Sequence, residues 1–453
     1  MARPSEITST QKLLRVIRKK RSVARAESDF SESPLKGGGR FTLPSPTLAA
    51  LKKSSTVGID VGRDYIRLVR VNEKGRGNRQ ILDRRRLPIP SNAPPDSPEF
   101  AAFLKSSLGS VCGSPKHSRL WVHMSSTKVD VHHISIPRVA TKLIGNMVYW
   151  TVKKESPFNE KEMILDFEVQ GEVTEAGVAK LAVMAYTAPR QEIEELKSLF
   201  SRIGWPLTGI TIAPFSVQNL FRTQWIPVFE LTVASLYVDA DSSRIDIYSG
   251  GNLVMTRGIK AGLNSMIDAL IEEINDKKTT PDAQPLTPEQ GREIIGRLGS
   301  EALTRRDGDV GFGLKKEAIF KMIEPALERL VRQVERTFEH FHTTKPDKRI
   351  ERIFISDAMN ISPSVVDYIG AQMGIASAIL DPLIDEDATA CPDVDDLRHV
   401  SERIAFGQAL SLALSDNERT PNLMLTYKDK EREVSIRRIN RVVFASFIAA
   451  ILI

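Results

Sequence analysis

The chain has 453 residues, of which 41% are hydrophobic and 26% are charged, and its formal net charge is +6. This composition excludes collagen-like, low-complexity and wholly disordered proteins, and the length allows about two to four domains. The two cysteines, Cys112 and Cys391, are too few for a disulfide framework and favour a reducing compartment. The seven histidines are scattered without metal-ligand spacing, so no metal site is expected.

The basic charge is concentrated at the two ends of the chain. Residues 1–50 hold ten Lys or Arg and four Asp or Glu, and Lys428–Arg441 holds six basic and three acidic residues. Residues 51–427 therefore carry a net charge of about −3. A nucleic-acid-binding domain carries its own basic surface, so nucleic acid is not expected as a partner.

The N-terminal segment, residues 1–54, reads as basic and largely disordered, because Gly, Ser and Pro are frequent and apolar periodicity is lacking over most of it. Within it, Gln11–Arg25 places four apolar residues before the basic run Arg18–Arg21. This stretch fits either a solvated basic tail or a short helix on a membrane surface. No apolar signal-peptide core follows it, which argues against export.

The body of the chain opens with a pattern that occurs twice. Thr56–Arg70 and Ser235–Ser249 each read as an apolar strand, an acidic turn and a second strand with alternating apolar residues. Their alignment matches Asp60 with Asp239, and a glycine turn after the second pattern leads into a third strand. Unless the likeness is a coincidence of short strands, it predicts two α/β lobes around a cleft.

Further elements are expected between and after the two hairpins. The first group forms a small α+β insertion, with strands at Val129–Ile136, Ile164–Val169 and Leu181–Tyr186 and helices at Thr141–Glu155 and Arg190–Ile203. The second group has a strand at Arg352–Ser356 and helices at Leu263–Ile274, about Lys315–His342, Pro363–Gln372 and Arg403–Leu414. Thr287–Gln290 forms a capping-box pattern, and Pro325 should kink the long helix or mark its start.

The C-terminal residues Val442–Ile453 are twelve uncharged residues. As a helix they would span about 18 Å, against about 30 Å of hydrocarbon in a bilayer. They fit either a buried core helix or the start of a transmembrane helix. The basic residues Arg437, Arg438 and Arg441 favour the second interpretation, with this flank and everything before it on the cytoplasmic side.

Four motifs in this order resemble the PilM family, actin-like cytoplasmic proteins of type IV pilus assembly that are related to the division protein FtsA. The motifs are VGIDVGRDYIRLVR from Val57, SPFNEKEMILDF from Ser156, GGNLVMTRGIKAG from Gly250 and DKRIERIFIS from Asp347. The resemblance covers roughly residues 55–415. It implies an α/β, actin-like fold of two duplicated ribonuclease-H-like lobes with an FtsA/PilM-type α+β insertion. The implied parts are lobe 1 at 55–128 and 400–416, the insertion at 129–212 and lobe 2 at 232–399.

The tail extends the resemblance. Pro421–Leu425 (PNLML), the basic stretch and the apolar run resemble the start of PilN, the single-pass membrane partner whose N-terminal peptide docks on PilM. This implies a PilN-like peptide and juxtamembrane stretch at 420–441 and the start of a membrane helix at 442–453. The secretion-system protein GspL joins an actin-like domain to a membrane helix in a similar way. The docking residues would be Asn422, Leu423, Met424 and Leu425, binding either their own body or that of a neighbour.

The resemblance also implies a nucleotide site between the two hairpins, with candidate residues Asp60, Gly62, Arg63, Asp239, Asp241 and Asp357. Several of these depart from the family pattern. Arg63 and Asp64 replace small hydroxyl residues, and Asp241 replaces a glycine whose lack of a side chain lets phosphate approach. Asp357 stands where relatives have a glycine cluster. The sequence therefore predicts a degenerate site, with no catalytic residues and no certain cofactor.

The expected function is that of a scaffold or adaptor, not an enzyme, in the inner-membrane platform of a type IV pilus or a related type II secretion system. Expected partners are PilN/PilO-like proteins, the assembly ATPase, the platform protein, further copies in a ring and the bacterial inner membrane. The alternative is an active actin-superfamily ATPase binding ATP and magnesium through Asp60 and Asp239. An FtsA-like division protein fits less well, because its membrane helix is amphipathic whereas Val442–Ile453 has no polar face.

Overall fold

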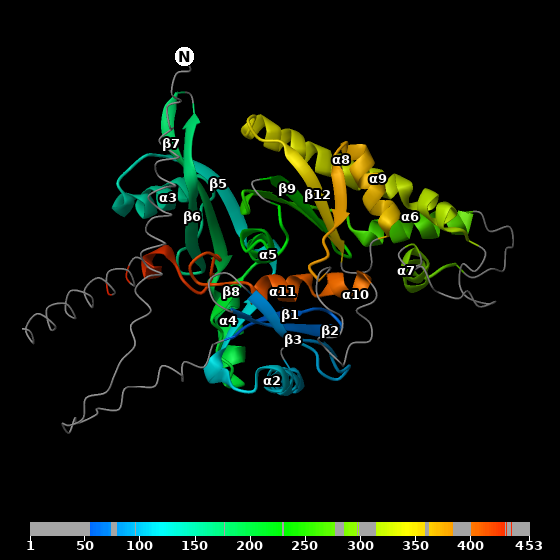
Figure 1. Cartoon of the computed structure of the whole chain (residues 1–453), viewed down its shortest axis with the longest axis horizontal. Helices are drawn as coiled ribbons and strands as arrows, with labels where there is room; N and C mark the ends of the chain where they lie inside the picture. Colours follow the sequence, from blue (N-terminus) through cyan, green and yellow to red (C-terminus); the bar gives the residue numbers. More distant parts are fainter. Residues whose placement is uncertain are drawn as a thin grey trace, which may run out of the picture. The chain divides into compact units, whose positions relative to one another are not determined.

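The computed structural model describes residues 55–73, 79–95, 97–175, 177–228, 231–276, 285–296, 298, 314–357, 362–383 and 400–430, together with 432 and 436 (Figure 1). The chain divides into residues 1–52 and 53–453, and all described residues belong to the second unit. The predictions for residues 1–54, for Arg437, Arg438 and Arg441 and for the apolar run Val442–Ile453 lie outside the described residues. Within the described ranges, no helix has both the length and the apolar character needed to cross a bilayer.

Two sheets repeat one strand order. The first is β3-β2-β1-β4-β8, made of Arg79–Pro88, Tyr65–Glu73, Ser55–Val61, Ser118–His123 and Gly209–Thr211. The second is β11-β10-β9-β12-β13, made of Asn252–Ile259, Ser243–Ser249, Thr232–Val238, Ile350–Asp357 and Ala376–Ile379. In each, three antiparallel strands are followed by two parallel ones. The duplicated hairpins predicted from the sequence are therefore confirmed, and each opens a lobe.

The insertion is built on a third sheet, β5-β7-β6, with strands Asp130–Pro137, Val178–Pro189 and Met163–Glu175. Helix α3 covers Thr141–Glu155, the predicted range. Strands β6 and β7 are longer than predicted, because they continue as a mostly exposed ribbon beyond the apolar stretch that made them recognisable. Helix α4 (Arg190–Arg202) follows, and its Ile193 and Phe200 are buried in the lobe 1 core.

Helices cover the second sheet in lobe 2: α6 (Leu263–Asp276), α7 (Pro288–Gly296), α8 (Lys316–Thr344) and α9 (Pro363–Met373). The capping box of α7 is confirmed. The Thr287 amide donates to Gln290 Oε1 at 2.9 Å, and the Gln290 amide donates to Thr287 Oγ1 at 3.3 Å. Pro325 lies inside α8 and does not mark its start, because the helix begins nine residues earlier at Lys316.

Lobe 1 includes α2 (Pro98–Cys112) and α5 (Ala213–Arg222), and its last helix differs from the prediction. The range Arg403–Leu414 forms two helices, α10 (Val400–Ala405) and α11 (Gly407–Ala413), which are separated at Phe406. The break lets α11 lie directly on β1, between the first sheet and α5 (Figure 1). A Cβ atom at Gly58 of β1 would lie 1.9 Å from the carbonyl oxygen of Ala409, so this approach requires glycine.

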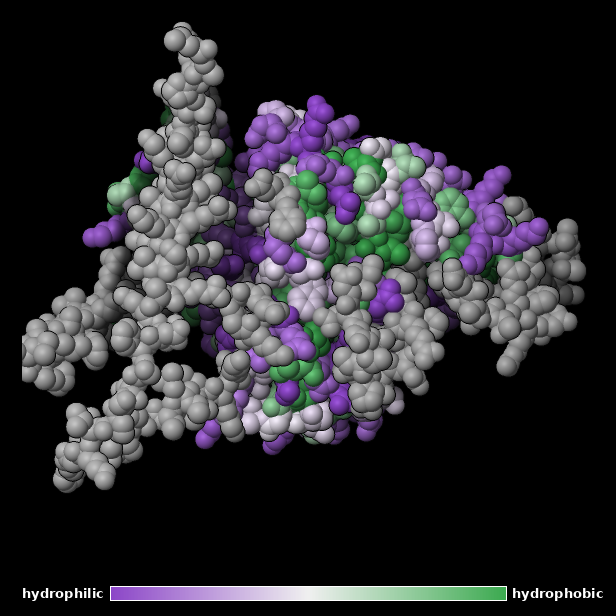
Figure 2. Space-filling view, viewed as in Figure 1, coloured by the Kyte–Doolittle hydropathy of each residue, from purple (hydrophilic) through white to green (hydrophobic). Residues whose placement is uncertain are grey.

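Three clusters of buried side chains stabilise the body. One fills lobe 1 and extends to the base of the insertion, to Leu423 and to residues of the second sheet such as Tyr248 and Phe354. One fills lobe 2, and the third fills the insertion and includes Tyr427. On the face shown in Figure 2, hydrophobic residues of the described parts are interrupted by hydrophilic ones. Because Leu423 and Tyr427 belong to these cores, the tail after α11 is part of the folded body.

Candidate functional site

A cleft of about 780 Å³ lies between the two hairpin turns, and we call it the inter-lobe cleft. Its lining includes the predicted residues Asp60, Gly62, Arg63, Asp239 and Asp241. The fold thus brings these residues together from both lobes. The sixth, Asp357, ends β12 opposite Val238, and its side chain lies outside the described part.

Asp60 at the end of β1 faces an arginine of its own sheet. Antiparallel pairing sets Asp60 opposite Arg67 of β2, and the carboxylate and guanidinium are 3.7 Å apart. Burial raises the pKa of Asp60 to about 6, although Arg67 opposes the shift. Burial therefore outweighs the nearby cation, and the ionised carboxylate is less stable here than in water.

Three backbone amides of the two turns have acceptors within the protein. The Gly62 amide donates to the Tyr65 carbonyl at 3.0 Å, and the Asp239 amide donates to the Ser242 carbonyl at 2.8 Å. The Ala240 amide donates to the carboxylate of Asp239 at 2.8 Å. Amide groups in such turns bind phosphate only when they point freely into the site. These three hydrogen bonds lie within the hairpins themselves.

Asp241 occupies the glycine position of the second turn and is held by a relay of side chains. Asn264 at the start of α6 donates to Asp241 Oδ1 at 2.7 Å, and Arg292 of α7 donates to Asn264 Oδ1 at 3.2 Å. Gly262 lets this loop pack closely, since a Cβ there would lie 2.5 Å from the Asp239 carbonyl oxygen. The sequence analysis missed Asn264 and Arg292, because the contact arises from packing between distant loops.

A third group closes the lobe 1 side of the inter-lobe cleft. The guanidinium of Arg86 stacks 3.9 Å from the ring centroid of Tyr65 and forms an ion pair with Glu402 of α10. Across the described ranges, no three His, Cys, Asp or Glu side chains come together as a metal site. The lobe 1 side of the cleft therefore contains two ion pairs, Asp60 with Arg67 and Arg86 with Glu402.

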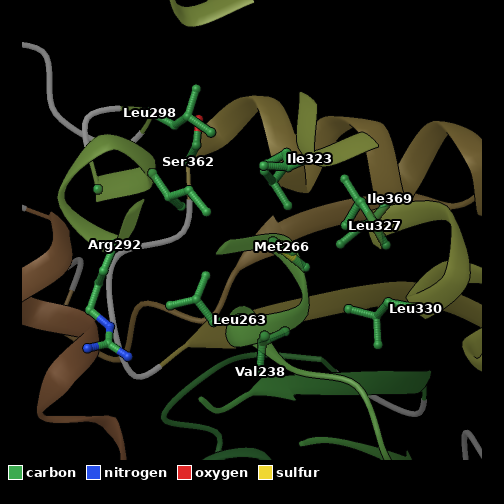
Figure 3. Close-up of a pocket in the computed structure, with 13 residues that line it drawn as sticks. Val238, Leu263, Met266, Arg292, Leu298, Ile323, Leu327, Leu330, Ser362 and Ile369 are labelled. Atoms are coloured by element: carbon green, nitrogen blue, oxygen red, sulfur yellow. The ribbon is translucent and has the colours of Figure 1, made fainter. Parts of the chain in front are cut away.

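Lobe 2 holds a second, apolar cavity of about 30 Å³, which Figure 3 shows between α6, α7, α8 and α9. Its walls include Leu263, Met266, Ile323 and Leu327, and Arg292 lies at one side (Figure 3). A volume of this size has room for about one or two water molecules. Apart from Arg292 and Ser362, its lining is apolar.

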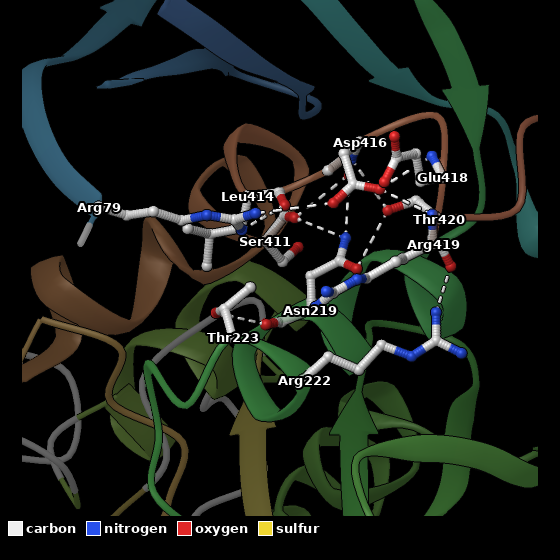
Figure 4. A network of polar contacts seen from close by, with 11 residues as sticks. Arg79, Asn219, Arg222, Thr223, Ser411, Leu414, Asp416, Glu418, Arg419 and Thr420 are labelled. Carbon is white, nitrogen blue, oxygen red and sulfur yellow. Dashed lines mark hydrogen bonds and ion pairs between the residues drawn. The ribbon is translucent and has the colours of Figure 1, made fainter. Parts of the chain in front are cut away.

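A second candidate site lies where the tail after α11 contacts the body of the protein (Figure 4). Asn219 of α5 donates to Ser415 Oγ at 3.0 Å and accepts a hydrogen bond from Thr420 Oγ1 at 3.1 Å. Arg79 of β3 donates to the Leu414 carbonyl at 2.7 Å and lies 3.6 Å from Asp416. These contacts turn the chain sharply after α11 and direct it towards β8.

The predicted docking peptide lies along β8, which ends the first sheet. The Leu423 amide donates to the Ile210 carbonyl at 2.8 Å, and the Ile210 amide donates to Asn422 Oδ1 at 3.2 Å. Asn422 Nδ2 donates to the Thr208 carbonyl at 3.0 Å. Asn422 and Leu423 are only 2% and 1% exposed, and Met424 packs half-buried on the core. The peptide therefore forms hydrogen bonds to the open edge of the first sheet, and both belong to the same chain.

A second anchor of the tail, Lys430, lies seven residues after Leu423 and contacts the insertion. Lys430 forms an ion pair with Asp166 of β6, and the hydroxyl of Tyr186 donates to the same carboxylate at 2.5 Å. Burial raises the pKa of Asp166, and Lys430 opposes this shift. The ring of Tyr427 packs 5.8 Å from that of Phe167. The signal for this anchor in the sequence is Asp166, one of two acids inside the strand Ile164–Val169.

Arg222, the last residue of α5, connects the tail to both lobes and to the insertion. It donates to the Arg419 carbonyl of the tail (Figure 4). It also donates to Glu168 of β6 at 2.6 Å and to Asn252 of β11 at 2.8 Å. We call this region, comprising Thr208–Ile210, Asn219, Arg222, Asp166 and Tyr186, the tail-docking surface. The sequence analysis did not identify these residues as functional.

No protein-family model and no curated protein matches the sequence. Among solved structures, a chain of the PilM–PilN type IV pilus biogenesis complex is 17% identical, with 80% of this chain and 98% of that one covered and a TM-score of 0.57. MreB 5 of Spiroplasma citri bound to AMPPNP is 12% identical, with 72% and 91% covered and a TM-score of 0.39. The cytoplasmic domain of EpsL, from the type II secretion system of Vibrio cholerae, is 8% identical, with 51% and 80% covered and a TM-score of 0.29.

The first of these likenesses, together with the repeated sheets, defines the chain as an α/β protein of the actin-like fold. Its fold is shared with a chain of the PilM–PilN complex over nearly the whole length of that chain. At 17% identity the likeness establishes the fold alone.

Proposed function

We propose that the protein is a non-enzymatic scaffold of the inner-membrane assembly platform of a type IV pilus or a related type II secretion system. The observation that carries the proposal is the tail docked on its own body, with Asn422 and Leu423 completing the edge of β8. The fold shared with the PilM–PilN complex supports it. In this role the body binds other platform proteins from the cytoplasmic side and links them to the membrane.

The proposal includes a fused tail of the PilN type. The segment after α11 would replace the separate peptide of a partner, so that docking occurs in cis. Beyond the described residues, the basic cluster Arg437, Arg438 and Arg441 and the run Val442–Ile453 would form the cytoplasmic flank and start of a membrane helix. PilN/PilO-like proteins, the assembly ATPase, the platform protein and further copies would be its partners.

The geometry of the inter-lobe cleft supports the non-enzymatic part of the proposal. A triphosphate needs free amide donors and uncompensated cations, whereas the amides of Gly62, Asp239 and Ala240 have acceptors within their turns. Asp241 adds negative charge where phosphate would approach. These residues do not fit a phosphate group.

One observation favours the rival candidate, an actin-superfamily ATPase. The cleft of about 780 Å³ is large enough for a nucleotide, and Asp60 and Asp239 stand at the ends of the two duplicated β1 and β9 strands. In that reading, both carboxylates would position hydrated magnesium. The scaffold and the ATPase make opposite predictions for the substitution Asp239→Asn.

The experiment is complementation of a deletion strain of the source organism with three forms of the gene. We expect Asp239→Asn to restore surface filaments or secretion to the wild-type level, because the scaffold needs no metal at this position. We expect Leu423→Asp to abolish both, because a charge cannot replace a buried leucine at the docking edge. Immunoblots of inner-membrane fractions control for protein level. Loss of assembly with Asp239→Asn at normal protein level would contradict the proposal and favour the ATPase.

A further inference from the structure

Helix α3 of the insertion exposes two large hydrophobic side chains. Trp150 is 64% exposed and Leu143 is 52% exposed, while Val148 and Val152 of the same helix are fully buried. Residues at positions i, i+3, i+7 and i+11 share a face of a helix, so Leu143, Trp150 and Lys154 line one outer stripe. The side chains of this stripe are not part of the hydrophobic core of the insertion.

The exposed face also carries positive charge. Lys142 and Lys154 are exposed, and the acids nearest in sequence are the terminal Glu155 and Glu160, which is paired with Lys153. An aromatic residue and a leucine flanked by lysines are typical of helices that lie at the surface of an anionic bilayer. There the apolar groups reach the acyl boundary and the lysines remain at the headgroups.

The end of the described tail lies beside the same helix. Tyr427 is buried in the cluster that contains Val148 and Val152, and Lys428 Nζ lies 5.9 Å from the ring centroid of Tyr149. The last described residue, Ile436, is 49% exposed. The next residues in the sequence are the arginine cluster and the uncharged run. The chain thus leaves the body next to α3 and continues into the segment with the composition of a membrane anchor.

We propose that the exposed face of α3 (Lys142, Leu143, Asn146, Trp150 and Lys154) rests on the anionic lipid surface from which the tail emerges. This inference depends on the membrane attachment in the proposed function. It adds a second, surface contact that fixes the orientation of the body relative to the bilayer. With only one flexible attachment, the body would rotate freely about its tail.

The test uses the full chain with vesicles of phosphatidylcholine and phosphatidylglycerol whose acyl chains are brominated, because bromine quenches tryptophan fluorescence at short range. The chain has four tryptophans, and Trp121 and Trp205 are 1% and 5% exposed. We expect quenching in the wild type and loss of most of it in Trp150→Phe, with unchanged circular dichroism. A second variant, Leu143→Ser/Trp150→Ser, should weaken vesicle binding about tenfold.

The matched control is Leu82→Ser/Val178→Ser, which removes exposed hydrophobic residues of lobe 1 and of the insertion ribbon and should leave binding unchanged. Vesicle binding without Trp150-dependent quenching would overturn this inference and leave the membrane attachment intact. Absence of binding by the wild type would overturn the attachment itself. A change in Trp150 fluorescence that depends on protein concentration and not on lipid would show that a second copy of the chain covers this face. That result would also overturn the inference.

Discussion

The inter-lobe cleft and the tail-docking surface both collect polar groups from distant parts of the chain, but they differ in what those groups contact. In the cleft, Arg63, Asp239 and Asp241 are exposed, and the amides of Gly62, Asp239 and Ala240 form hydrogen bonds within their own hairpins. On the docking surface, Asn219 and Asp166 are at most 2% exposed and bond to the tail.

This difference shows which interactions stabilise the protein. A buried polar group that loses its partner costs about 1–3 kcal/mol, whereas an exposed one regains water. The docking surface therefore depends on a specific segment of the same chain, whereas the exposed groups of the inter-lobe cleft can be solvated by water.

The largest effect is expected from Leu423→Ala. The side chain is 1% exposed and packs in the lobe 1 core, so its truncation should lower the free energy of unfolding by about 2–5 kcal/mol. Urea unfolding followed by circular dichroism measures the change. Leu82→Ala, at a position that is 39% exposed, is the control and should change stability by less than about 0.5 kcal/mol. Equal effects of the two variants would mean that the tail is not docked.

A smaller loss is expected from Asn422→Ala. It leaves the Ile210 amide and the Thr208 carbonyl buried without their partner, at a cost of about 1–3 kcal/mol. Faster hydrogen exchange at the Ile210 amide should accompany this loss. The exposed Asn146→Ala on α3 provides the comparison. If Ile210 exchange is unchanged, the hydrogen bond to Asn422 does not exist in solution.

In the cleft, Asp60→Asn should be stabilising in a pH-dependent way. The folded-state pKa of Asp60, about 6, lies above the unfolded value of 3.8, so the folded state binds the proton more tightly. Wild-type stability should therefore fall as pH rises from about 4 to about 6, by about 1–2 kcal/mol. The asparagine variant should lack this fall and exceed the wild type at pH 7. A destabilised variant at pH 7 would show that the ion pair with Arg67 outweighs burial.

No effect is expected from Mg·ATP on the wild type. A ligand present at about 100 times its Kd stabilises by about 2.7 kcal/mol, which raises Tm by several degrees. Differential scanning fluorimetry with millimolar Mg·ATP should show no such shift, because the turn amides of the cleft are already bonded. The Asp241→Gly variant removes the obstructing carboxylate and tests whether that group alone prevents binding. A clear shift in the wild type would contradict the degenerate site.

Much of the fold could be predicted from the sequence, because the two hairpins and the amphipathic helices carry strong periodicity. The elements that were missed lack it. Helix α5 has only ten residues, and its polar residues Ser216, Gln218 and Asn219 are buried together with its apolar ones. Strand β8 has only three residues. The charged strand β3, with Arg84–Arg86, does not resemble a buried strand. The break at Phe406 follows from packing of α11 on Gly58, which local sequence does not encode.

The candidate site was predictable to the extent that strand ends and a peptide motif marked it. Asp60 and Asp239 were located by the repeat, and Asn422 and Leu423 by the resemblance of the tail. Their partners were not predictable, because they depend on register and on loop packing. Arg67 faces Asp60 through strand pairing, and Asp166 meets Lys430 across 264 residues of sequence.

The most direct test of the central claim is hydrogen exchange of the full chain at high dilution, with and without Mg·ATP. The account predicts that the amides of Ile210 and Leu423 are protected at all protein concentrations and that Mg·ATP changes no amide at the two hairpin turns. Protection of Leu423 that disappears on dilution would show docking between chains. New protection at Gly62 or Asp239 with Mg·ATP would show that the cleft is a nucleotide site, and either result would contradict the account.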